Sequence, residues 1–188
     1  MRTLAIKFAL FLGCLLVLYL FGRVYSADVH FKASRALLSD QSLSEALVES
    51  NLAVSLNPWE PSYRLTRARI YLSQAQGLSE DTSNSLRLEA LNDLQAAFNL
   101  NSINLTTIRN SLPLYYLLAQ NSEMGFLSYA REYFNFVKRT YPTDAGALVA
   151  VAKYEKELNL LEEVEITKNL IKVDRADLLE WHEDVKDL

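Results

Sequence analysis

The chain contains few of the residues that form catalytic or metal centres. It has one cysteine and two histidines in 188 residues. His30 and His182 lie near opposite ends of the chain, and no motif for zinc binding, phosphate binding or nucleophilic catalysis occurs. The single cysteine, Cys14, excludes a disulfide within one chain. We therefore expect a protein without enzymatic activity, cofactor or bound metal.

Glycine and proline are also scarce, with five and four residues, and apolar residues do not alternate with polar ones as in β-strands. Half of the residues are apolar, which is enough for a continuous core in a chain of this length. The formal net charge is −4 and no basic run occurs, so we expect no nucleic-acid partner. These features predict an all-helical fold.

The N-terminus is apolar. Residues 8–22 are uninterrupted by polar side chains, and residues 3–22 give about 20 residues, enough for roughly 30 Å of helix. We expect residues 1–26 to form a transmembrane anchor that contacts lipid through residues 3–22. Because the N-terminal tail is short, the expected topology is a single pass through the cytoplasmic membrane, with the rest of the chain extracytoplasmic.

A cleaved signal peptide is the alternative interpretation of this segment. Val24 and Ser26 stand at the two positions that signal peptidase inspects, which would leave Ala27 as the mature N-terminus. Arg23 directly precedes that site, and the apolar run is long for a signal peptide. Both features favour an uncleaved anchor.

Helical signals continue from Ala27 without a flexible linker. Asn57-Pro58 should end one helix and Pro61 should begin the next, which we expect to reach about Ala75. Ala46 and Ala53 would share one helix face, where small side chains let a neighbouring helix approach. The same spacing recurs at Ala90 and Ala97, after a polar insert at Gln76–Ser85.

Later signals are less regular. Pro113 should kink or split its helix, and Thr143 is the expected N-cap of a following one. Ser42 and Glu45 have the spacing of a capping box. The pattern predicts a repeat domain at residues 27–175, with about four helical hairpins, and a capping helix at residues 176–188, with Trp181 in its core.

Residues 27–175 resemble the tetratricopeptide repeat family. The match rests on alanines, aromatic residues and prolines at the family's spacings: Ala46, Ala53, Asn57-Pro58, Ala68, Tyr71, Ala90, Ala97, Ala130, Phe134 and Pro142. The junction at residues 57–72 also resembles, more narrowly, the repeat tails of O-antigen ligase-like polymerase proteins. The multi-span catalytic portion of those proteins is absent here, so their glycosyl-transfer activity is not carried over.

The resemblance implies a TPR-like superhelix whose first helices line a concave partner-binding groove. The groove positions it implies are Phe31, Arg35, Leu65, Arg69, Leu72, Arg109, Tyr116, Val149 and Lys153. One cation for each repeat, interleaved with apolar side chains, suits an extended or helical protein segment that carries carboxylates and apolar anchors. The alternative is that these cations are solvated or paired with neighbouring acids.

The expected function is a non-enzymatic, membrane-anchored scaffold for protein–protein interactions in the cell envelope, with glycan-polymer machinery among the candidate partners. Two alternatives remain open at this stage. One is a cleaved, secreted or periplasmic binding module. The other is a structural subunit of a membrane complex, in which Gly13 and Gly22 would let partner helices pack against the apolar segment.

Overall fold

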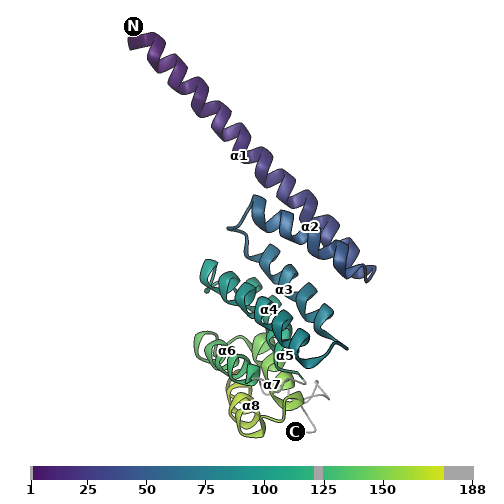
Figure 1. Ribbon diagram of the computed structural model, residues 1–188. Coiled ribbons are helices and arrows are strands. Elements are labelled where there is room, and N and C mark those ends of the chain that lie inside the picture. The colour runs from purple at the N-terminus through teal and green to yellow at the C-terminus, as the bar shows by residue number, and fades with distance from the viewer. Residues whose placement is uncertain (1, 121–124, 176–188) are drawn as a thin grey trace.

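The computed structural model describes residues 2–120 and 125–175. Those residues form eight helices and no strand (Figure 1), so the all-helical prediction is confirmed for them. The helices are α1 (Arg2–Ser39), α2 (Leu43–Leu56), α3 (Pro61–Ala75), α4 (Glu80–Leu100), α5 (Leu105–Ala119), α6 (Phe126–Thr140), α7 (Ala145–Glu157) and α8 (Leu161–Arg175). The predicted capping helix at residues 176–188, with Trp181, lies outside the described residues.

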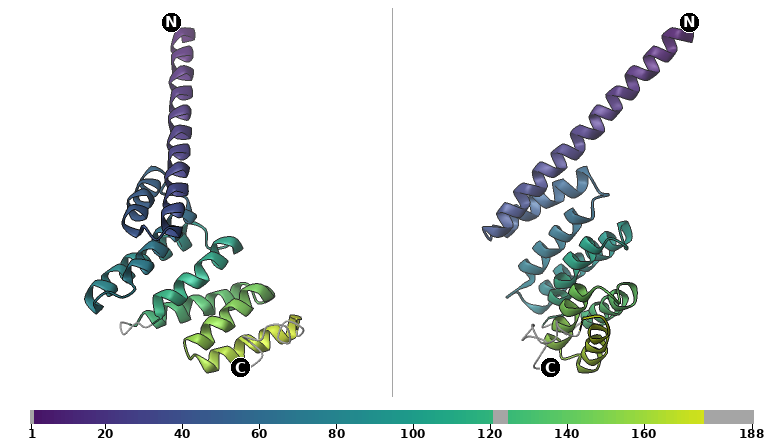
Figure 2. Two further views of the ribbon diagram at one scale, coloured as in Figure 1. Left: turned by 90° about the vertical axis from the view of Figure 1, so that its right-hand side faces the viewer. Right: turned by 180° about the vertical axis from the view of Figure 1, so that it is seen from behind.

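The helices pack in sequential pairs. α1 packs against α2, α3 against α4, α5 against α6 and α7 against α8, and the second helix of each of the first three pairs also contacts the first helix of the next. The odd-numbered helices contact one another in succession from α1 to α7. Figures 1 and 2 show the pairs following one another away from the N-terminus. The odd-numbered helices therefore share one face of the array, which we call the odd-helix face.

Alanine side chains allow close approach between helices in this array. Ala46, Ala53, Ala90, Ala97 and Ala130 are all 0% exposed. They lie on α2, α4 and α6, the second helices of the first three pairs. Because a methyl group adds little thickness, the neighbouring backbones can pack closely over these positions. The predicted seven-residue alanine spacing thus marks the buried face of α2 and of α4.

The proline-containing turn between α2 and α3 forms as predicted. α2 ends at Leu56, and Pro61 occupies the first position of α3. Before it, the Glu60 side chain accepts a hydrogen bond from the backbone N–H of Ser62 at 3.2 Å. Proline has no N–H to satisfy in the first turn, and its fixed φ suits a helix. The turn sequence therefore determines both helix ends.

Two helices differ from the prediction. α4 begins at Glu80, inside the loop expected at Gln76–Ser85. Glu80 and Asp81 lie in its first turn, where carboxylates interact favourably with the helix dipole, so the helix extends into the serine- and asparagine-containing segment. α5 continues through Pro113, so the helix does not split there.

One predicted capping box does not form, and one predicted N-cap is wrong. Ser42 precedes α2, but its side chain makes no capping hydrogen bond, and the capping box with Glu45 does not form. The N-cap of α7 is Asp144 rather than Thr143, and the Asp144 carboxylate accepts a hydrogen bond from the N–H of Ala147 at 2.8 Å. Since an ionised carboxylate is a stronger acceptor than a hydroxyl, α7 begins one residue later.

Two main buried clusters connect the pairs. The larger one runs through α3 to α7 and includes Leu94, Ile108 and Phe134. The smaller one joins α1 to α2 and α3 through Ala27 and Tyr63. The Tyr63 hydroxyl also donates a hydrogen bond to Asp28 of α1. The C-terminal half of α1 is therefore part of the packed array.

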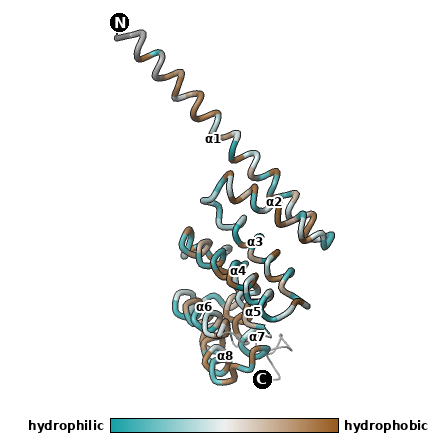
Figure 3. The backbone as a smooth tube through the Cα atoms, viewed as in Figure 1, coloured by the Kyte–Doolittle hydropathy of each residue, from teal (hydrophilic) through white to brown (hydrophobic). Residues whose placement is uncertain are grey.

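The N-terminal half of α1 has different surroundings. Residues 10–22 are exposed, and Figure 3 shows their apolar character. The contact between α1 and α2 includes Arg23, whose guanidinium donates a hydrogen bond to the carbonyl of Ser55 at 3.2 Å. Among the described helices, α1 is the one long and apolar enough to cross a membrane, a property that signal sequences share. It runs without interruption across the predicted boundary between Ser26 and Ala27.

Candidate protein-binding groove

Four of the predicted groove residues line one hollow on the odd-helix face. Phe31 and Arg35 come from α1, and Leu65 and Arg69 come from α3. The hollow has a volume of about 330 Å³, and we call it the arginine hollow. Its remaining lining residues, from α3 and α5, are Ser62, Thr66, Asn110 and Leu114. Three consecutive odd-numbered helices thus contribute to one concave site.

The floor of the arginine hollow is apolar and well packed. Leu65 and Leu114 are buried, and Phe31 packs against the ring of Tyr63 with 4.8 Å between ring centroids. The guanidinium of Arg35 lies over the ring of Phe31, 5.7 Å from its centroid, in a cation–π contact. The ring therefore supports the arginine from below, which reduces the conformational freedom lost when a ligand binds.

The two arginines give the hollow a positive charge. Both side chains are exposed, and neither Arg35 nor Arg69 pairs with a carboxylate among the described residues. Arginine presents a planar fork of donors that fits a carboxylate. The arrangement can therefore bind an acidic side chain at each arginine, with an apolar side chain between them.

An aromatic pair extends this surface toward α7. Tyr116 stacks on Tyr154 with 4.9 Å between ring centroids. A hydrogen bond to Glu157, with a smaller effect of burial, raises the pKa of Tyr116 to about 12. Burial raises the pKa of Tyr154, and the positive charges of Lys153 and Arg69 oppose that shift. The positive charge of Arg69 therefore acts both in the arginine hollow and on the stacked tyrosine pair.

The other predicted groove residues do not line the arginine hollow. Arg109 donates from one guanidinium nitrogen to both carboxylate oxygens of Asp144, at 2.7 and 2.8 Å. Leu72 is buried in the larger cluster, and Val149 packs against the cluster formed with α8. Lys153 is exposed on α7. Of the predicted groove cations, Arg35 and Arg69 therefore line the hollow, whereas Arg109 pairs with Asp144.

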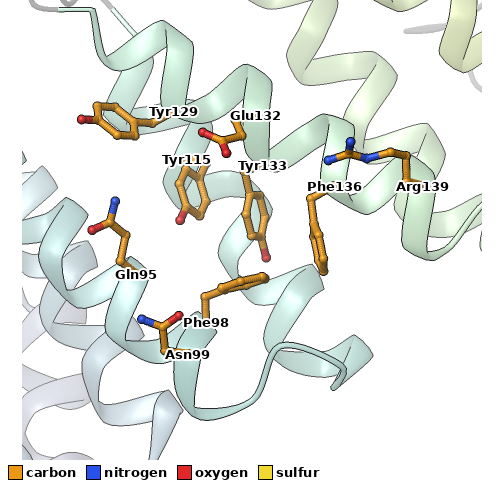
Figure 4. A pocket seen from close by; sticks show the side chains of 9 residues that line it. All are labelled: Gln95, Phe98, Asn99, Tyr115, Tyr129, Glu132, Tyr133, Phe136 and Arg139. Carbon is orange, nitrogen blue, oxygen red and sulfur yellow. The ribbon is translucent and has the colours of Figure 1, made fainter.

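A second hollow lies away from the predicted residues, between α4, α5 and α6. It has a volume of about 370 Å³ and is lined by Gln95, Phe98, Asn99, Tyr115, Tyr129, Glu132, Tyr133, Phe136 and Arg139 (Figure 4). We call it the aromatic hollow. The rings of Tyr115 and Tyr133 stack with 4.0 Å between centroids, and Phe98 meets Phe136 edge to face at 4.9 Å. Sequence reasoning missed this site because its rings come from three helices.

Tyr115 places a buried hydroxyl at the aromatic hollow. Tyr115 is 5% exposed, and burial raises the pKa of its hydroxyl above the usual value. The hydroxyl makes no hydrogen bond within the described part of the chain, and Figure 4 shows it pointing into the open space near Gln95. Because the hydroxyl faces the hollow, water can reach it and can provide the hydrogen bond that the described residues do not. In a closed core the same hydroxyl would have no hydrogen-bond partner.

Two largely buried ion pairs join helices to one another. Lys138 of α6 donates to Glu155 of α7 at 2.7 Å, and Thr167 of α8 donates to the other carboxylate oxygen at 2.6 Å. Burial raises the pKa of Glu155, and the hydrogen bonds from Lys138 and Thr167 act in the opposite direction. Arg67 pairs similarly with Asp93 at 2.6 Å, which connects α3 to α4. These partners satisfy one another, so the pairs act in packing.

Residues 2–120 and 125–175 contain no group of three or more His, Cys, Asp or Glu side chains placed to hold a metal ion. His30 bonds to Glu49 at 2.7 Å on the surface between α1 and α2.

The observations define a class: an all-helical chain of packed helix pairs that begins with one long apolar helix. Comparison with known proteins does not narrow that class. No protein-family model, curated protein or solved structure matches the chain.

Proposed function

We infer that this protein is a membrane-anchored, non-enzymatic scaffold that binds an acidic segment of a partner protein in the arginine hollow. The observation that carries the proposal is the pair of arginines, Arg35 and Arg69, over an apolar floor at the base of an apolar helix. The partner belongs to the cell envelope, and glycan-polymer machinery is among the candidates.

Helix packing supports a tetratricopeptide-type superhelix for residues 27–175. Each odd-numbered helix from α1 to α5 contacts the next odd-numbered helix, as the first helices of stacked hairpins do. Ala68 and Ala97 are fully buried, as are Ala130 and Phe134. In such arrays the face lined by the first helices is the usual binding surface, which is where the arginine hollow lies.

The continuity of α1 supports an anchor that stays attached. Cleavage before Ala27 would cut α1 in the middle and would place a new charged terminus at a residue that is 0% exposed. It would also remove Arg23, which bonds to Ser55 of α2. An intact α1 keeps both interactions.

The anchor is tested by protease protection of a C-terminal tag in sealed membrane vesicles, read together with the mass of the membrane-bound product. A full-length protein with its tag outside the cytoplasm supports the proposal. A tag on the cytoplasmic side would contradict the assignment to the cell envelope. A mature N-terminus at Ala27 would show that the anchor is cleaved and would favour a secreted binding module.

The groove is tested by photo-crosslinking in native membranes from Thr66, a lining residue of the arginine hollow without a charge. The crosslinked partner segment is then made as a peptide and titrated into the purified full-length chain. Arg35→Glu and Arg69→Glu should each weaken binding about tenfold or more, because each removes a charge-assisted contact. Lys32→Glu, an exposed change on α1, is the matched control. Equal affinities for all these variants would contradict the proposed site.

A further inference from the structure

Two turns of the array expose large apolar side chains to an unusual degree. Trp59, in the turn between α2 and α3, is 77% exposed, and Ile103, in the turn between α4 and α5, is 80% exposed. Exposed apolar side chains that are scattered singly are normal, so exposure alone does not identify a contact surface. The positions of these turns indicate what they contact.

Both turns lie along the side of the array that faces the apolar half of α1. α2 runs back along α1, and Ser55 near its end bonds to Arg23, just beyond the last residue of the apolar run. Figure 1 and the right-hand view of Figure 2 show the α2–α3 turn and the α4–α5 turn on the side of the array toward the N-terminal half of α1, and the α3–α4 turn on the opposite side. The α2–α3 turn therefore follows closely after the residue that bonds at the edge of the apolar run, and the α4–α5 turn lies on the same side of the array.

The turns are held in place by hydrogen bonds. The Tyr141 hydroxyl donates to the carbonyl of Ile103 at 2.7 Å, which fixes the α4–α5 turn against the turn after α6. The Glu60 side chain is engaged by the backbone and hydroxyl of Ser62 at 3.2 and 2.8 Å. Trp59 and Ile103 thus project from ordered backbone, so little entropy is lost when they are covered.

The chemistry of this end suits the boundary between lipid and water. Tryptophan and tyrosine prefer the headgroup region, where the ring is partly apolar and the polar group stays hydrated. Tyr25 of α1, at the same boundary, is 73% exposed. The residues that flank Ile103 in its turn, Ser102 and Asn104, are polar and uncharged, and so do not oppose approach to a lipid surface.

We propose that Trp59 and Ile103 insert into the interface of the bilayer that α1 crosses, so that the array rests on the membrane at two turns in addition to its anchor. This inference depends on the anchor proposed above, and it adds a second, peripheral contact with the same lipid surface. Three points, α1 and the two turns, then determine how the odd-helix face is oriented above the membrane.

The test uses the full-length chain reconstituted in phosphatidylcholine vesicles at a high ratio of lipid to protein. The chain has two tryptophans, so Trp181→Phe leaves Trp59 as the single fluorophore. Its emission should be shifted to the blue and quenched by lipids brominated high on the acyl chain, more than by lipids brominated near the chain end. A second variant, Ile103→Trp without Trp59 and Trp181, should behave in the same way.

The matched control is Leu78→Trp in the same tryptophan-free background. Leu78 is also exposed, but it lies in the α3–α4 turn at the opposite end of the array, so its emission should be neither shifted nor quenched. Equal quenching at all three positions would indicate non-specific adsorption and would overturn the proposal.

The remaining outcomes separate this inference from the anchor. A chain that resists alkaline extraction from the vesicles but has red-shifted, unquenched Trp59 emission keeps the anchor and contradicts the two-turn contact. Blue-shifted emission without quenching would show that protein, such as a second copy of the chain, covers the turn, and this also overturns the proposal. A chain that alkaline extraction releases would remove the anchor itself.

Discussion

Loss of the Lys138 ammonium should loosen the last helix pair, α7 and α8, while the first two pairs stay intact. The side chains of Lys138 and Glu155 are 5% and 1% exposed and lie 2.7 Å apart. Lys138→Met leaves a buried carboxylate whose remaining described donor is Thr167. Breaking one partner of a buried pair costs about 3–5 kcal/mol. The low end, about 3 kcal/mol, applies here because burial already raises the pKa of Glu155 and makes its protonation easier.

Amide hydrogen exchange of the full-length chain in detergent micelles measures this effect locally, because stacked helix pairs need not unfold together. A loss of about 3 kcal/mol corresponds to roughly 150-fold faster opening. We expect this acceleration in α7 and α8, with exchange in α3 and α4 unchanged. Unchanged exchange in α7 and α8 would refute the assignment of a stabilising role to the pair.

A double variant and a pH series test the physical reason. Lys138→Met combined with Glu155→Met removes both charges and should recover most of the lost protection, because no unpaired carboxylate remains. In the single variant the pKa of Glu155 rises further above its unfolded value. A raised folded pKa gives stability that is present below the unfolded pKa and lost as pH rises through the folded one. The difference from wild type should therefore shrink as pH falls.

Two further changes probe the caps and hollows. Asp144→Ala should cost about 1–2 kcal/mol, seen as faster exchange in α7, because it removes the N-cap bond to Ala147 and the pair with Arg109. Burial alone would raise the pKa of Asp144, but those hydrogen bonds hold it below the usual value, so this contribution is present at neutral pH and lost as pH falls through the lowered pKa. Tyr115→Phe should change thermal stability by less than about 0.5 kcal/mol, because the hydroxyl has no partner among the described residues. A larger loss would mean that ordered water in the aromatic hollow satisfies the hydroxyl.

Local signals made much of the fold predictable. Proline fixes φ and lacks a donor, so Pro61 determines the start of α3, and the predicted span of that helix agrees with the structure. The alanine spacing identified buried faces because helical periodicity is a property of neighbouring residues. The start of α4 was missed because composition suggested a loop, whereas the favourable charges of Glu80 and Asp81 extend the helix.

The candidate site was predictable only in part. The resemblance to tetratricopeptide repeats implied groove positions for Arg35 and Arg69 on first helices, and the structure brings both to one hollow. The partner of Arg109 could not be predicted, because Asp144 is 35 positions further along the chain and meets it only after α5 and α7 have packed. The aromatic hollow is also non-local, since helices from two successive pairs must meet to form it.

The uninterrupted course of α1 has a mechanical consequence. Its 38 residues form a rod of about 57 Å with no proline and no break between the apolar half and the half that packs on α2. A spanning helix tilts when the hydrocarbon layer becomes thinner than its apolar length. Because this rod has no hinge, such a tilt turns Arg35 and the whole arginine hollow with it. In a membrane-anchored chain, such a tilt would act against the proposed contact of Trp59 and Ile103 with the bilayer, and the balance of the two would set the direction from which a partner segment can enter.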